Sequence, residues 1–158
     1  MTYHAPYASP LGMLTITSDG ESLKELRFSD NPVEVVSPAI PILEETRRWL
    51  DSYFNGEEPA FTPQVAPFGT LFQRRVWLEL MDIPYGETAT YGDIAQRIGC
   101  KSAQAVGGAV GRNPIAIIIP CHRVVGADGT LTGYAYGLER KRQLLTLEKS
   151  LLLNPLNS

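Results

Sequence analysis

The sequence predicts an α/β fold of the α+β type, in which an antiparallel three-stranded sheet with one helix precedes a mainly helical part. Strand-like alternation is confined to the amino-terminal region, and helical periodicity dominates beyond it. Residues 55–68 separate the two regions, because they hold three prolines and show no periodicity. We therefore expect two domains, residues 1–66 including the linker and residues 67–158.

The amino-terminal domain begins with three short strands, predicted at residues 2–8, 12–18 and 22–29. Apolar and polar residues alternate in the second and third strands, and Ser18-Asp19-Gly20 supplies a hairpin turn, so we expect an antiparallel meander. Apolar residues at helical spacing then predict a helix over residues 42–54, which covers one face of the sheet.

Two helices open the carboxy-terminal domain. Apolar residues at helical spacing predict the first over residues 72–80. Thr90 caps the second, and Asp93 three residues later resembles the partner in a capping box, so we expect this helix to run to Ile98.

A third helix follows the turn Gly99-Cys100-Lys101, with Ser102 as its cap, and extends to about Val110. Helix, short turn and helix is the arrangement of many DNA-binding proteins, although many helical hairpins bind nothing. Residues 103–109 are nearly all small, so this helix can approach either a protein core or the minor groove of DNA closely. Two adjacent glycines there cost roughly 2 kcal/mol of helix propensity, so their lack of bulk should serve a purpose.

The run Pro120-Cys121-His122-Arg123-Val124 sets a thiol beside an imidazole, directly after the apolar residues 115–119. The thiolate is the nucleophilic form of cysteine, so a buried thiol stays inert unless a base or a cation lowers its pKa. In the last predicted helix, residues 138–152, Glu148 falls inside the apolar stripe with Lys141 beside it. Glu148 is either a solvated rim residue or, if buried, the group that orients the imidazole for nucleophilic catalysis.

Charge is divided unevenly along the chain. Residues 1–66 carry 4 Lys and Arg against 10 Asp and Glu, and residues 67–158 carry 10 against 7, so the net charges are −6 and +3. The carboxy-terminal domain can therefore approach phosphates, although a net charge of +3 also fits an ordinary solvated surface.

The few cysteines and histidines exclude other classes. Cys100 and Cys121, together with His4 and His122, cannot assemble a four-ligand zinc site of normal spacing, so we expect no metal and no structural disulfide. We also expect no membrane association, since no stretch approaches the roughly 20 apolar residues of a membrane span. Without a signal-peptide pattern, the expected location is cytoplasmic, or nuclear in a eukaryote.

A set of motifs in the second half of the chain carries a family resemblance. The motifs are Ile83-Pro84-Tyr85-Gly86-Glu87-Thr88, Tyr91, Ala105-Val106-Gly107-Gly108, Asn113-Pro114 and Ile119-Pro120-Cys121-His122-Arg123-Val124. Together they resemble the O6-alkylguanine-DNA alkyltransferase family, also called methylated-DNA:protein-cysteine methyltransferases. The resemblance implies a ribonuclease-H-like amino-terminal domain and a winged-helix domain that carries the active site.

The resemblance implies direct-reversal DNA repair. Cys121 takes the alkyl group, usually methyl, from O6 of guanine or from O4 of thymine in one irreversible displacement, without a cofactor. His122 removes the thiol proton through a water, Glu148 holds the imidazole, and Asn113 fixes the loop before the cysteine. Because adjacent side chains on an extended backbone point to opposite faces, a bridging water or a turn must join Cys121 to His122.

The implied partner is double-stranded alkylated DNA, which a monomer binds through the minor groove before swinging the nucleotide out of the duplex. Tyr91 donates a hydrogen bond to the base as it leaves, and the carbonyls of Cys121 and Val124 read the guanine edge. The amide of Ala135 faces O6. Further residues expected at the pocket or on the DNA are Thr90, Ser102, Ala103, Gln104, Ala105, Gly107, Gly108, Arg112, Tyr134, Tyr136 and Lys141.

Two positions depart from the family pattern. Gln104 stands where the family usually has an arginine that fills the gap left by the extruded base. Glutamine is shorter and uncharged, so we expect weaker duplex binding and slower repair. Arg112 could make up for the lost affinity by contacting a phosphate of the DNA. Tyr136 is glycine in some relatives, and its ring should narrow the pocket against benzyl adducts. The zinc ligands of some relatives' amino-terminal domains are missing.

Two other functions stay open at this point. A protein that binds alkylguanine without repairing it would lack Cys121, and the intact mass after incubation with methylated DNA distinguishes it. A cysteine hydrolase or thiol redox protein would use Cys121, His122 and Glu148 with an oxyanion hole or a resolving cysteine, and neither is evident in the sequence.

Overall fold

The computed structural model describes residues 1–31 and 37–149 and divides the chain into two compact units. The first unit consists of Met1–Phe68 with Pro114–Ala116, and the second begins at Gly69 and holds the rest. The return of Pro114–Ala116 to the first unit was not expected from the sequence. Within the described ranges, no helix is long and apolar enough to cross a membrane.

The first unit is built on a sheet of three antiparallel strands in the order β1-β2-β3. These are β1 (Tyr3–Ser9), β2 (Gly12–Ser18) and β3 (Leu23–Phe28), so the predicted meander is confirmed. Leu14 and Ile16 are fully buried on one face, because side chains two residues apart on a strand point the same way.

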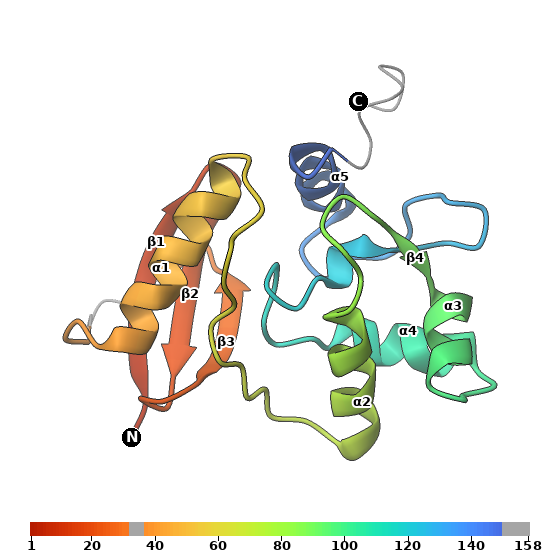
Figure 1. The fold of residues 1–158 in the computed structure, drawn as a ribbon, viewed down its shortest axis with the longest axis horizontal. Helices are drawn as coiled ribbons and strands as arrows, with labels where there is room; N and C mark the ends of the chain where they lie inside the picture. The colour runs from red at the N-terminus through yellow and green to blue at the C-terminus, as the bar shows by residue number, and fades with distance from the viewer. Residues whose placement is uncertain (32–36, 150–158) are drawn as a thin grey trace. The chain divides into compact units, whose positions relative to one another are not determined.

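Helix α1 (Pro41–Phe54) lies across one face of this sheet, as Figure 1 shows. Its buried side chains include Leu43, Leu50 and Tyr53, which fall on one stripe at helical spacing. The helix ends where Gly56 takes a φ of 83°, a left-handed conformation that costs glycine little.

The outer edge of β3 pairs with two segments from elsewhere in the chain. Leu23 exchanges two backbone hydrogen bonds of 2.8 and 2.9 Å with residues 64–66 of the linker. Leu26 pairs in the same way with residues 114–116, at 2.9 and 2.8 Å. The strand that would otherwise expose its backbone groups is therefore covered.

The second unit contains three helices that pack on one another, α2 (Leu71–Leu80), α3 (Tyr91–Arg97) and α4 (Ala103–Gly111). The predicted capping box of α3 is confirmed, since the side chain of Thr90 accepts from a backbone amide and the reciprocal bond is present. Ser102 caps α4 by accepting from the third residue of that helix at 3.0 Å. The helix-turn-helix order predicted from the sequence is present.

A short parallel pairing links the start of α3 to the segment after the cysteine. It joins β4 (Ala89–Thr90) and β5 (Val124–Val125), which the sequence did not predict because two residues leave no periodicity. Nε1 of Trp77 donates to the carbonyl of Ala109 at 2.8 Å and so fixes α2 against α4. The last helix, α5 (Leu138–Leu147), follows a glycine-rich loop.

Two local segments bear on the sequence predictions. The backbone at Cys121–Arg123 is a 3₁₀ turn (η1), and a turn was one of the two links expected between Cys121 and His122, the other being a bridging water. Helix α5 ends at Leu147, where Glu148 serves as the C-cap and Lys149 has a φ of 67°. The remainder of the predicted helix, residues 150–152, lies outside the described residues.

Candidate active site

A cavity of about 160 Å³ in the second unit is bordered by α4, the cysteine turn and the loop before α5. The residues expected from the sequence that line it are Tyr91, Gly107, Asn113, Cys121, Tyr134, Ala135 and Tyr136. Val110, Gly111 and Gly133 also line it and were not expected. The cavity therefore gathers residues from segments more than forty positions apart in the sequence.

Cys121 supplies the thiol at this cavity and is only 8% exposed. Burial raises the pKa of the thiol, while a hydrogen bond with the Asn113 side chain and the positive charge of Lys141 act in the opposite direction. Burial is the largest of these effects, so the resting group is the protonated thiol and needs a base before it can attack.

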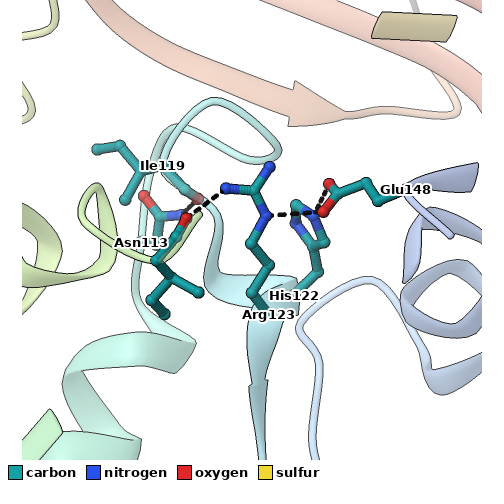
Figure 2. A network of polar contacts seen from close by, with 6 residues as sticks. Asn113, Ile119, His122, Arg123 and Glu148 are labelled. Carbon is teal, nitrogen blue, oxygen red and sulfur yellow. Dashed lines mark hydrogen bonds and ion pairs between the residues drawn. The ribbon is translucent and has the colours of Figure 1, made fainter. Parts of the chain in front are cut away.

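Asn113 ties the end of α4 to the segment that leads into the cysteine. It is buried, and its Nδ2 donates to the carbonyl of Ile119 at 2.8 Å (Figure 2). The same side chain hydrogen-bonds Cys121. Asn113 thus fixes the backbone of Ile119, before Pro120, relative to the thiol of Cys121, after it.

His122, the residue after Cys121, forms a buried pair with Glu148, and neither of the two is among the residues that line the cavity. Nε2 of His122 lies 2.5 Å from Oε2 of Glu148, and the two residues are 0% and 1% exposed. Since an ionised carboxylate only accepts, Nε2 is the protonated nitrogen and Nδ1 carries the free lone pair. Nδ1 is buried and has no hydrogen-bond partner within the part of the chain that the structure describes.

The protonation states of this pair follow from its surroundings. Burial lowers the pKa of His122 and outweighs the opposite effect of Glu148, so the imidazole is neutral. Burial alone would raise the pKa of Glu148, but the charges and hydrogen bonds of His122 and Arg123 hold it below its usual range. The cluster therefore contains an ionised carboxylate and a neutral base.

Arg123 is a member of this cluster that was not predicted as a site residue. Its Nε donates to Oε1 of Glu148 at 2.7 Å, and the side chain is nearly buried (Figure 2). The sequence showed Arg123 next to Cys121 and His122 but gave no sign that it reaches a carboxylate 25 positions away.

Lys141 holds the loop that forms one wall of the cavity. Its Nζ donates to the carbonyls of Thr132 and Gly133 at 2.7 and 3.2 Å, directly before Tyr134. The hydroxyl of Tyr91 donates to the same Thr132 carbonyl at 3.4 Å. Burial lowers the pKa of Lys141 to about 8, although a negative charge on the active thiol would raise it.

Two tyrosine rings stand at this wall. The rings of Tyr134 and Tyr136 meet edge to face, with centroids 5.7 Å apart and an interplanar angle of 73°. Both residues line the cavity, so the ring of Tyr136 occupies space that a glycine would leave open.

The remaining expected residues do not line the cavity. An exposed group on and around α4 consists of Ser102, Ala103, Gln104, Ala105, Gly108 and Arg112. Val124 is fully buried in β5, and Thr90 caps α3. In residues 1–31 and 37–149, no three His, Cys, Asp or Glu side chains gather closely enough to hold a metal ion.

The fold of the second unit does not require a residue as small as glycine at position 108 of α4. A Cβ at Gly108 would meet no atom within 4 Å, and one at Gly107 would lie at an ordinary 3.7 Å from the ring of Tyr91. The lack of bulk at Gly108 therefore has no explanation among the described protein atoms.

Comparison with known proteins gives matches to both units. Residues 2–67 match the ribonuclease-like domain of 6-O-methylguanine DNA methyltransferase, and residues 71–150 match the DNA binding domain of the same family. Methylated-DNA–protein-cysteine methyltransferases of Haemophilus influenzae and Methanosarcina acetivorans are each 48% identical over 154 residues. These alignments cover 93% and 94% of this chain and 86% and 99% of the relatives. The structure of Mycobacterium tuberculosis OGT in complex with DNA matches with a TM-score of 0.84 and 47% identity, covering 93% of this chain and 92% of that chain.

Proposed function

We propose that this chain, which belongs to the 6-O-methylguanine DNA methyltransferase family, repairs alkylated DNA by direct reversal and that Cys121 is the residue that takes the alkyl group. The observation that carries the proposal is that Cys121 lines a cavity while the next residue, His122, is a neutral imidazole that Glu148 holds. A buried thiol, a base and an orienting carboxylate are the parts that nucleophilic catalysis needs.

The reaction begins with proton transfer. Nδ1 of His122 is the base, because Nε2 is engaged with Glu148, and one water carries the proton from Cys121 to it. The sulfur then forms a bond to the methyl carbon while the bond between that carbon and O6 breaks. The electron pair stays with the guanine, which takes up the proton, so the products are a thioether and unmodified guanine.

The protein is consumed in this reaction. The thioether on Cys121 has no leaving group that would restore the thiol, so each molecule repairs one lesion. The nucleophile and the base come from the protein and the leaving group is the repaired guanine, so no cofactor takes part.

The cavity receives the guanine after the nucleotide swings out of the duplex, which costs a few kcal/mol. The carbonyls of Cys121 and Val124 accept hydrogen bonds from the guanine edge. The amide of Ala135 donates to O6, and the ring of Tyr134 packs on the base. The two carbonyl contacts of Lys141 support this arrangement, since they fix the loop that carries both groups.

Helix α4 enters the minor groove in this proposal. The exposed small residues allow the backbone to approach the duplex closely, and Gln104 occupies the place of the extruded base. Arg112 and Ser102 contact phosphates, and Tyr91 donates to the base as it leaves. The protein acts as a monomer, because one chain supplies every residue of the site. It acts in the cytoplasm, or in the nucleus of a eukaryote.

The test compares Cys121→Ser with Cys100→Ser, a control that alters the only other cysteine. A duplex containing one O6-methylguanine is incubated with each protein, and the remaining lesion is quantified by chromatography of the released bases. We expect the Cys100→Ser protein to remove one lesion per molecule and the Cys121→Ser protein to remove none. Removal by Cys121→Ser, or many lesions removed per wild-type molecule, would overturn the proposal.

A further inference from the structure

Arg123 is held by three contacts that fix the position of its guanidinium. Nε donates to Oε1 of Glu148 at 2.7 Å, and Nη1 donates to the carbonyl of Ile83 at 2.7 Å. The guanidinium carbon lies 5.8 Å from the centre of the Tyr85 ring, within the range of a cation–π contact. A planar, rigid donor group held in this way has little freedom to leave the carboxylate.

The carboxylate of Glu148 is consequently divided between two partners. Oε1 accepts from Arg123 and Oε2 pairs with His122, and Figure 2 shows both side chains pointing toward the same carboxylate. If His122 were its only partner, a buried carboxylate would favour the imidazolium form strongly. An imidazolium could not accept the proton of the thiol.

The charged groups around His122 come from two elements. Glu148 at the end of α5 favours the imidazolium, whereas Arg123 in η1 and Lys141 in α5 disfavour it, as does burial. Of these two cations, Arg123 donates to the Glu148 carboxylate, whereas Lys141 donates to a backbone carbonyl. Arg123 therefore offsets the negative charge of Glu148 directly and reduces its effect on His122.

We infer that Arg123 is a positioning residue that keeps His122 neutral, by sharing the Glu148 carboxylate, so that Nδ1 can accept the proton of Cys121. This inference rests on the proposed function, since it assigns the arginine a part in preparing the base. Ile83 and Tyr85 contribute to this role, because their contacts with the guanidinium anchor the arginine.

The test is the titration of His122 by NMR in wild type and in Arg123→Met, which keeps the aliphatic stem and removes the charge. His4 is the only other histidine, so a His4→Gln background leaves one imidazole to observe. We expect the His122 imidazole to stay neutral in wild type down to weakly acidic pH and to gain its proton at higher pH in Arg123→Met. The ratio of methyl-transfer rates at pH 8 and pH 6 should then rise by roughly tenfold, the effect of moving one ionisation by about one unit.

Two further variants separate charge from folding. Arg123→Lys restores the positive charge without the planar guanidinium, so the titration of His122 and the ratio of rates at pH 8 and pH 6 should both return toward wild type. Arg142→Met removes a partly exposed arginine whose partner is Glu139, and it should change neither the titration nor the rate.

The inference is overturned if His122 titrates identically in folded Arg123→Met and wild type. It is also overturned if the wild-type imidazole is already protonated near pH 7, a result that does not require any variant to fold. Neither result bears on whether Cys121 accepts the methyl group, which the comparison of the two cysteine variants tests separately.

Discussion

Glu148→Gln removes one charge from the buried cluster and alters both contacts of that side chain. The side-chain oxygen of glutamine can still accept from Nε of Arg123. Its amide group then faces Nε2 of His122, and because two donors cannot bond to each other, the imidazole must move its proton to Nδ1. The lone pair that accepts the proton of Cys121 is thereby lost.

The magnitudes follow from burial. Removing one partner of a buried ion pair costs about 3–5 kcal/mol, since the remaining charge stays in the interior. Arg123 keeps the carbonyl of Ile83 and one neutral acceptor, so we expect the free energy of unfolding to fall by about 2–3 kcal/mol. Loss of the general base should slow methyl transfer by about 10²–10⁴-fold.

The effect on stability depends on pH in a defined direction. Burial acts to raise the pKa of Glu148, but His122 and Arg123 outweigh it and hold the folded value below the unfolded value of about 4.3. The stability contributed by the ionised group is therefore fully present above that unfolded value and is lost as pH falls toward the folded pKa. The difference between wild type and Glu148→Gln should shrink accordingly below about pH 4.

Urea unfolding at pH 7 and pH 3.5 measures the stability, and single-turnover transfer from a methylated duplex measures the rate. Glu139→Gln is the matched control, because Glu139 lies on the same helix with an exposed side chain and pairs with Arg142. That control should change stability by less than about 0.5 kcal/mol. A Glu148→Gln protein as stable as wild type and within about threefold of its rate would refute the reasoning.

Three substitutions test the face of α4 and the cavity. Gly108→Ala should raise the free energy of unfolding by roughly 0.5–1 kcal/mol, because the new methyl group meets no atom within 4 Å, yet weaken duplex binding measured by fluorescence anisotropy. Gln104→Arg should tighten duplex binding and speed repair of duplex DNA, because a longer, charged side chain fills the gap of the extruded base better. Tyr136→Gly should speed labelling of Cys121 by O6-benzylguanine, measured by mass spectrometry, because it removes the ring that narrows the cavity.

A control variant or a contradicting result accompanies each of these three substitutions. Gln96→Arg adds the same charge on an exposed position of α3 and should not reproduce the faster repair of Gln104→Arg. Unchanged duplex affinity in Gly108→Ala would contradict the placement of α4 in the minor groove. Rapid benzyl labelling of the wild-type protein would contradict the role given to Tyr136.

Much of the fold could be predicted because its signals are local. The alternation in β2 and β3 and the stripe of α1 each need only neighbouring residues, and Thr90 with Asp93 marked a helix start that both reciprocal bonds confirm. The pairing of β4 with β5 left no such signal, since it spans two residues on each strand. The return of residues 114–116 to the sheet depends on contacts far apart in sequence.

The sequence indicated which residues form the site better than it indicated their contacts. Glu148 stood out because a carboxylate lay inside an apolar stripe, and the structure buries it against His122. Arg123 gave no comparable signal, because a single arginine beside a histidine does not indicate which carboxylate it meets. The 3₁₀ turn at Cys121 is too short to leave a periodicity in the sequence, so the sequence could not decide between a turn and a bridging water as the link to His122.

The most direct measurement is the intact mass of the protein after exposure to one equivalent of duplex carrying O6-methylguanine, followed by peptide mapping. We predict that the protein gains one methyl group, that it resides on Cys121 and not on Cys100, and that the duplex regains guanine. A duplex freed of its methyl group while Cys121 remains unmodified would contradict the central claim, as would a folded protein that leaves the lesion in place.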